Sequence, residues 1–231
     1  MKHTIWRKTI WAALLTAAFL TGATGCGEKI NEADTSSAAS DSSAVDVIQN
    51  NDESAEVTAK DGAYSYEMNA DGTITLTGYQ GEEKELNVPA TIDSYVVSAI
   101  GNHAFEANWD ITSVTLPNGL SVIGEGAFMD CGSLTAVQIP ETVSVVQRAA
   151  FAGCSSLTSV VLPETVSEVM EEAFTGCGSL TSLTVVNSAL EYHAWGLIEG
   201  AEPLPVTISC ASGSAIEAWA GANGIATQPI S

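Results

Sequence analysis

Basic residues are scarce in this chain. Its 231 residues include 7 Lys and Arg against 28 Asp and Glu, so the formal net charge is −21. Nucleic-acid binding depends on clustered basic side chains that neutralise phosphates, and this composition therefore argues against a nucleic-acid partner. It also argues against attachment to an anionic membrane surface through a basic patch.

Catalytic motifs are lacking as well. The sequence contains no HExxH, GxSxG or phosphate-binding loop pattern. Its three histidines are His3, His103 and His193, and none of them belongs to such a motif. We expect His103 and His193 to be surface or partly packed side chains. The sequence predicts no catalytic residue, no metal site and no cofactor.

The N-terminal apolar run, residues 10–20, is too short to span a bilayer comfortably. Basic residues precede this run, and the small residues 22–25 lead to Cys26. The arrangement resembles a bacterial lipoprotein signal peptide. That resemblance implies that Cys26 is diacylated and becomes the N-terminus of the mature chain. An ordinary secretory signal cleaved nearby and an uncleaved anchor are the alternatives.

Large apolar side chains are rare after Cys26. The stretches 35–43 and 50–53 consist mostly of Ser, Ala, Asn and acidic residues. Such a segment cannot bury enough apolar surface to offset the entropy lost on ordering. Residues 26–60 are therefore predicted to be a disordered, acidic, Ser-rich tether with a reach of about 30 Å.

A 23-residue repeat forms the body of the chain. Cys131, Cys154 and Cys177 are 23 residues apart, and the same spacing relates three Ala-Phe pairs. One period upstream, Phe105 keeps the aromatic place and Asn108 takes the cysteine place. Agreement at so many positions indicates a repeat architecture, in which each unit shares its apolar faces with its neighbours. The three Ala-Phe pairs end in Phe128, Phe151 and Phe174.

Each unit contains the pattern Leu-x-x-Val-x-Leu/Ile-Pro, as in residues 134–140. Alternation places Val137 and Ile139 inward from a short strand, which the proline then ends. Together with the Ala-Phe pair and the following Cys or Asn, this pattern resembles the BspA-type leucine-rich repeats of bacterial surface proteins. The resemblance covers residues 64–227. It implies a leucine-rich-repeat solenoid, with a short parallel sheet on one side and turns or short helices on the other.

Both ends of such an array need covers, because a terminal unit exposes its apolar face. Residues 64–68 and 73–77 alternate around Asn69–Gly72, which predicts a β-hairpin. Downstream, residues 206–208 predict a last strand and residues 214–220 a short helix. We therefore divide the chain into a signal peptide (1–25), the tether (26–60), an N-terminal β-hairpin cap (61–90), leucine-rich repeats (91–186) and a C-terminal strand–helix cap (187–231).

The repeated cysteines occupy equivalent places in successive coils. Adjacent strands lie about 4.8 Å apart, so neighbouring cysteines are close enough for a disulfide. Parallel side chains oppose disulfide torsion geometry, however, and they do not converge on a metal ion. Since Asn108 fills the same place, we interpret Cys131, Cys154 and Cys177 as small buried thiols. A disulfide and a metal site are the alternatives.

Between the inward residues, the outward strand positions carry small and mostly neutral side chains. Stacked in register, they form an uncharged surface on an acidic protein, which we call the strand face. Solenoids commonly bind partners through such a surface, although Thr and Ser also suit any exposed strand. The strand face consists of Ser113, Thr115, Ala136, Gln138, Ser159, Val161, Ser182 and Thr184.

Two functions fit these features. The first is a non-catalytic, lipid-anchored cell-surface protein that binds other macromolecules in the manner of an adhesin. Its partner is an extracellular or host protein, and it contacts the membrane only through Cys26. The alternative is an accessory subunit or enzyme of the cell envelope, with a site in residues 187–210. A defined pocket around Glu191, His193 and Trp195 favours this alternative, whereas a continuously packed cap favours the first function.

The lipid anchor can be tested with Cys26→Ala. Removing the acylated thiol should move the protein from the membrane fraction to the medium or periplasm, because no other part of the chain is predicted to hold a bilayer. Detergent phase partitioning followed by immunoblotting measures this change. If the variant partitions like the unmodified chain, Cys26 is not the anchor.

Overall fold

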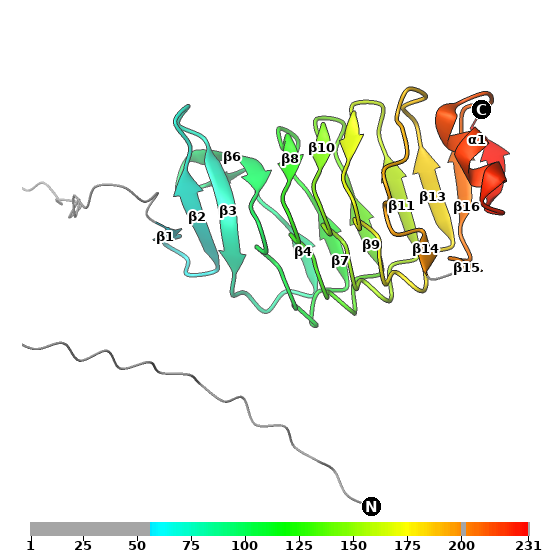
Figure 1. Ribbon diagram of the computed structural model, residues 1–231. Helices are drawn as coiled ribbons and strands as arrows, with labels where there is room; N and C mark the ends of the chain where they lie inside the picture. The colour runs from blue at the N-terminus through cyan, green and yellow to red at the C-terminus, as the bar shows by residue number, and fades with distance from the viewer. Residues whose placement is uncertain (1–55, 200–201, 231) are drawn as a thin grey trace, which may run out of the picture. The chain divides into compact units, whose positions relative to one another are not determined.

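The computed structural model describes residues 56–199 and 202–230 of the chain. The predicted signal peptide, Cys26 and residues 26–55 of the predicted tether lie outside the described residues. The described part winds into a solenoid whose coils stack from the hairpin, in cyan, to α1, in red (Figure 1). Each central coil contributes one strand to each of two sheets.

The first sheet, which we call the ribbon sheet, has seven strands that are all parallel to their neighbours. Its central strands are the predicted Leu-x-x-Val-x-Leu/Ile segments, and Pro117, Pro140 and Pro163 follow shortly after three of them. Because proline lacks an amide donor, it prevents the strand from continuing. The strands, in spatial order, are β4 (Glu85–Asn87), β7 (Ser113–Thr115), β9 (Ala136–Gln138), β11 (Ser159–Leu162), β13 (Ser182–Val185), β16 (Thr207–Cys210) and β17 (Ala226–Pro229).

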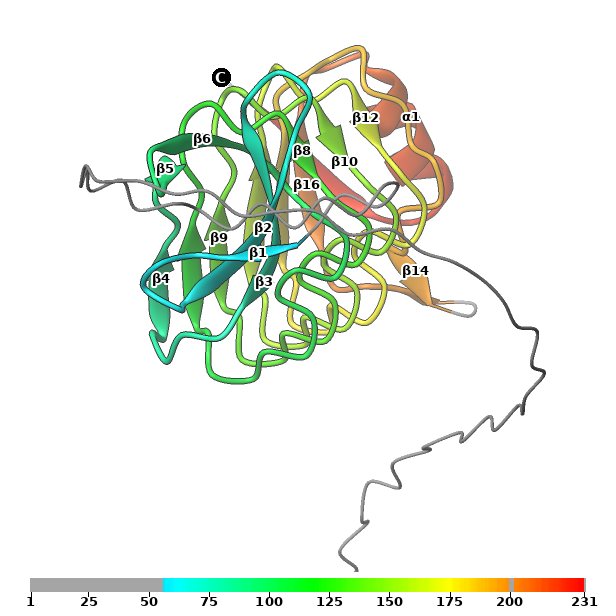
Figure 2. The ribbon, with the colours of Figure 1, turned by 90° about the vertical axis from the view of Figure 1, so that its left-hand side faces the viewer.

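A second sheet, the hairpin sheet, lies where the sequence predicted turns or short helices. Its repeat strands are only two residues long, and each pairs in parallel with the next coil. In Figure 2, which views the stack from the hairpin end, these strands and the ribbon sheet form different sides of the coils. The members are β1 (Val57–Thr58), β2 (Tyr64–Met68), β3 (Ile74–Tyr79), β5 (Thr91–Ile92), β6 (Tyr95–Ile100), β8 (Val122–Ile123), β10 (Val145–Val146) and β12 (Glu168–Val169).

At the N-terminal end, β2 and β3 form an antiparallel hairpin around Asn69–Gly72. Strand β1, which the sequence assigned to the tether, pairs antiparallel with β2. On its other side, β3 pairs in parallel with β6 and so joins the hairpin to the repeats. The ring of Tyr79 lies 5.6 Å from that of Phe105, so an aromatic side chain covers the first repeat.

At the C-terminal end, the 23-residue register is lost. Trp195 is fully buried, and its indole Nε1 donates a hydrogen bond to the carbonyl of Val169 at 2.9 Å. The helix α1 (Ala215–Ala222) begins after the N-cap Ser214, and its Trp219 stacks on Tyr192. A two-stranded antiparallel pair, β14 (Ile198–Glu199) and β15 (Glu202–Pro203), completes this end. Within the described ranges, no helix has the length and apolar character needed to cross a membrane.

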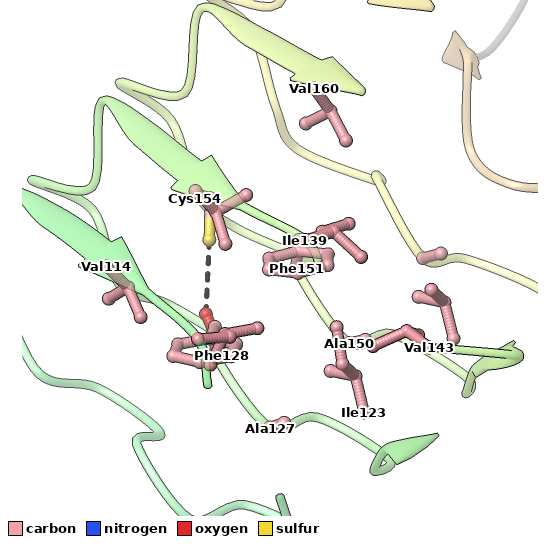
Figure 3. Close-up of a cluster of buried hydrophobic side chains, with 14 of the residues drawn as sticks. Val114, Ile123, Ala127, Phe128, Ile139, Val143, Ala150, Phe151, Cys154 and Val160 are labelled. Carbon is pink, nitrogen blue, oxygen red and sulfur yellow. Dashed lines mark hydrogen bonds between the residues drawn. The ribbon is translucent and has the colours of Figure 1, made fainter. Parts of the chain in front are cut away.

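The core is a column of stacked phenylalanines. The ring centroids of Phe105 and Phe128 are 4.9 Å apart, and the next two steps measure 5.4 and 5.9 Å. The ring planes agree within 5° at every step. Figure 3 shows Phe128 and Phe151 in successive coils, with the Cys154 thiol hydrogen-bonded between them. The identical side chain thus fills the identical gap in each coil.

The turns that carry the phenylalanines are held by their own backbone ladder. The amide of Phe128 donates to the carbonyl of Ala150, and that of Phe151 donates to Ala173. To direct these amides toward the next coil, the backbone enters the left-handed region at Gly126, Ala149 and Glu172, with φ of 57°, 53° and 61°. Non-glycine residues in this region are strained by roughly 1–2 kcal/mol each.

The phenylalanine column should be the most sensitive part of the fold. Phe151 is fully buried between two other rings. Phe151→Ala should therefore lower the free energy of unfolding by about 3–5 kcal/mol, because it opens a cavity between coils. Urea denaturation followed by circular dichroism measures this loss, and Val161→Ala on the surface serves as the control. A loss below about 1 kcal/mol would show that Phe151 does not carry the stacking.

The strained turn predicts a stabilising substitution. At Ala149, glycine removes the left-handed strain and keeps the backbone that Gly126 already adopts one coil earlier. Ala149→Gly should raise the free energy of unfolding by about 0.5–1 kcal/mol after the entropy of the unfolded glycine is subtracted. The matched control is Ala152→Gly in the same turn, where φ is not positive, and it should destabilise by about 0.5–1 kcal/mol. Equal effects of the two changes would contradict this explanation.

Candidate functional site

The strand face forms two rows across the ribbon sheet. In the first row, Ser113, Ala136, Ser159 and Ser182 are direct partners on adjacent strands. In the second row, Thr115 pairs with Gln138, and Val161 pairs with Thr184. The structure therefore brings all eight predicted residues onto one surface, and each is exposed or half-buried.

Strand periodicity creates this surface. Residues between the two rows point into the core, where Val114, Val160 and Leu183 are at most 2% exposed. Successive side chains of a strand alternate between its two faces, so the flanking residues must point outward. Among them, Val161 is 52% exposed, which makes it the largest apolar contribution to the strand face.

The structure extends the two rows beyond the predicted residues. In β16, Thr207 and Ser209 continue them, and in β17 Ala226 and Gln228 do so. The amide of Gln228 donates to the hydroxyl of Ser209 at 2.7 Å. The alternation of Thr207–Cys210 could have revealed β16, because Ile208 and Cys210 are buried. All four residues of β17 are exposed, so no sequence pattern marks it.

Threonine hydroxyls line the start of the ribbon-sheet strands. The Oγ1 of Thr135 donates to the carbonyl of Thr112 at 2.8 Å, and Thr158 and Thr181 repeat this bond at 3.2 and 3.3 Å. These hydroxyls are therefore occupied in holding one coil to the next. They fix the register of the strand face, which leaves partner recognition to the residues beside them.

Charge gathers on the turns instead. Arg148 lies 2.7 Å from the carboxylate of Glu172 and 3.9 Å from that of Glu125. His103 pairs with Glu106 at 3.1 Å in an earlier turn. From Ser113 to Gln228, by contrast, the paired outward residues of the ribbon sheet include no acidic or basic side chain. The neutral and charged surfaces of the coil are thus separate.

The repeated cysteines are buried thiols, as predicted. Each donates to the carbonyl of a phenylalanine, with sulfur–oxygen distances of 3.0 Å for Cys131, 3.1 Å for Cys154 and 3.2 Å for Cys177. Burial raises the pKa of the Cys131 thiol to about 11, so this thiol stays protonated at neutral pH. In the same place, the Oδ1 of Asn108 accepts from two backbone amides of its turn. The position is therefore structural.

Residues 187–210, the alternative site, are brought together only in part. His193 is exposed, and its Nε2 lies 3.9 Å from the Glu191 carboxylate. Trp195 instead belongs to the core, and its indole is bonded to Val169. His193 does line a hollow of about 340 Å³, but with Arg148 and Glu171 rather than with Trp195. In the described ranges, no three His, Cys, Asp or Glu side chains are grouped closely enough to hold a metal ion.

Comparison with known proteins follows the same repeat. A family model described as "BspA type Leucine rich repeat region" matches residues 84–195 in six copies. These copies span the ribbon-sheet strands from β4 to β13. The search of curated proteins gives no match.

Several solved structures share the fold. A leucine-rich repeat protein from Bacteroides capillosus is 33% identical with a TM-score of 0.51, and the match covers 58% of this chain and 99% of that one. A leucine rich cell surface protein from Faecalibacterium prausnitzii is 26% identical with a TM-score of 0.56, covering 75% of this chain but only 42% of that one. The pneumococcal vaccine antigen PcpA, at 18% identity and a TM-score of 0.51, shares the fold alone.

Proposed function

Because this chain belongs to the BspA-type leucine-rich repeat family, we propose that it is a non-catalytic, adhesin-like protein of the bacterial cell surface. The strand face binds an extracellular or host protein, and a lipid on Cys26 holds the chain to the membrane. The F. prausnitzii relative, a cell surface protein, supports the location, although this chain spans under half of its length. The signal-like N-terminus supports the anchor.

The observation that carries the binding role is the neutrality of the strand face. The chain has 28 acidic residues, yet the outward rows from Ser113 onward contain none. The cores of protein interfaces are depleted in charged residues, because burying an unpaired charge is costly. Short hydroxyl and amide side chains, with Val161 among them, can be covered by a partner at a small desolvation cost.

Rigidity supports the same conclusion. Every row of the strand face sits on strands whose backbones pair in register, and the Thr112–Thr181 hydroxyls bond each coil to the previous one. The surface is therefore ordered before a partner arrives. Association then loses little conformational entropy on this side of the interface, which favours affinity.

The proposal can be tested by adding charge to the strand face. Ser159→Glu and Ser182→Glu, made separately, should each abolish binding, because a carboxylate would be buried without a partner. Both should change the free energy of unfolding by less than about 0.5 kcal/mol, as expected for exposed positions. The ligand is first identified by pull-down from extracellular and host proteins, and binding is then measured by biolayer interferometry.

The control is Glu171→Lys on the turns, a larger change in charge, which should leave binding nearly intact. Binding through a neutral surface should also depend weakly on salt. If binding falls steeply with salt, fails with Glu171→Lys and survives both serine changes, the acidic turns are the contact surface. The partner is then a basic protein.

A further inference from the structure

Trp109 departs from the repeat in a way that the fold does not require. Its equivalents in the next three coils are Gly132, Ser155 and Gly178, so a small residue is sufficient at this place. Trp109 is nonetheless 64% exposed, the highest value of any large hydrophobic residue in the described ranges. An indole in this position adds little to the core, which leaves a role at the surface.

The indole is held in a fixed position. Its six-membered ring lies against Gly132, where the carbon of any side chain would collide with ring atoms Cζ3 and Cε3. Gly132 is thereby buried beneath the ring. With its position defined on one side and its exposure still high, the indole presents aromatic surface to a ligand.

A hollow of about 330 Å³ adjoins the ring. Tyr79 and Phe105 contribute further aromatic surface to it, and Glu106 and Asp110 contribute carboxylates. The loop between them is fixed, because the Oδ1 of Asn108 accepts a hydrogen bond from the Asp110 amide at 3.1 Å. None of the described residues that line this hollow is Lys or Arg.

We propose that this hollow binds an arginine side chain of a partner protein. A guanidinium stacks on aromatic faces, with tryptophan the best of them, and donates hydrogen bonds to carboxylates in the same plane. Trp109 supplies the face, and Asp110 and Glu106 supply the carboxylates. The net charge of −21 raises the local concentration of cations further. This site lies on the turn before β7, outside the strand face, and is independent of it.

The test uses N-acetyl-arginine amide as the probe and the full chain as the protein. The two-dimensional NMR signal of the Trp109 indole, identified by its loss in Trp109→Ser, should shift saturably, while that of buried Trp195 stays in place. The titration runs to about 100 mM, since a single side chain binds in the millimolar range. N-acetyl-citrulline amide, which has nearly the same shape without the charge, should bind much more weakly.

Two variants locate the site. Trp109→Ser copies the residue of the equivalent place at Ser155 and should remove the saturable response of the neighbouring Tyr79 signals without unfolding the chain. Asp110→Asn should weaken binding about two- to fivefold, the change expected for an exposed cation–aromatic or ionic contact. Ser159→Glu, on the strand face, should leave the arginine titration unchanged.

Other results would overturn the proposal. Equal shifts with the arginine and citrulline probes would show that charge plays no part. A stronger response to methyl N-acetyl-glucosaminide would identify a neutral sugar site instead. A response that never saturates, with the Trp195 signal steady, would mean that the hollow is only a surface irregularity. None of these outcomes depends on whether the strand face binds a protein.

Discussion

Stacking of identical side chains between successive coils is the constraint on which the rest of this structure depends. A single 23-residue coil has no second layer to cover its inward residues, so its apolar surface is buried only against neighbouring coils. The phenylalanine column shows this most directly, because Phe128 and Phe151 pack within 2° of parallel. Equal rise at every coil is what permits the rings, thiols and hydroxyls each to form a continuous column.

The same register that builds the core also organises the surface. If Val137 and Val160 point inward at one spacing, the residues beside them must point outward at that spacing. The strand face is thus a geometric consequence of the packing, and only its chemistry is free to vary. In this chain the variation keeps charge off the ribbon sheet and places it on the turns, where Arg148 lies between Glu125 and Glu172.

The sequence predicts the periodic features well. The 23-residue period alone leads to the ribbon sheet, the buried phenylalanines and cysteines, and the outward position of all eight strand-face residues. The hairpin of β2 and β3 follows from alternation around Asn69–Gly72. In each case the signal is either repeated several times or carried by a turn with a strong local preference.

The hairpin sheet escaped prediction because its strands are too short to show alternation. Strand β10 has two residues, of which Val146 is buried and Val145 half-buried. Its pairing in register with β8 and β12 comes from the backbones of neighbouring coils and leaves no local pattern. The strand therefore exists only because the adjacent coils present matching backbone groups.

The end of the array was obscured for a related reason. Phe151 donates its amide to a carbonyl 22 residues ahead (173 − 151), whereas Phe174 donates to one 21 residues ahead (195 − 174). The last coil is one residue shorter, so a search at the fixed period loses it. Trp195 then fills the space with a larger side chain and bonds to Val169.

Departures from a repeat carry information that the repeat itself cannot. A residue type kept in every coil, such as the buried phenylalanine, is explained by packing alone. Asn108 differs from the cysteines but still satisfies its own turn, so it too is structural. Trp109 satisfies nothing comparable, since its equivalents are glycine or serine and most of its surface meets water. An exposed indole carries a solubility cost that a serine would avoid, and this cost is the reason to look for a ligand at its surface.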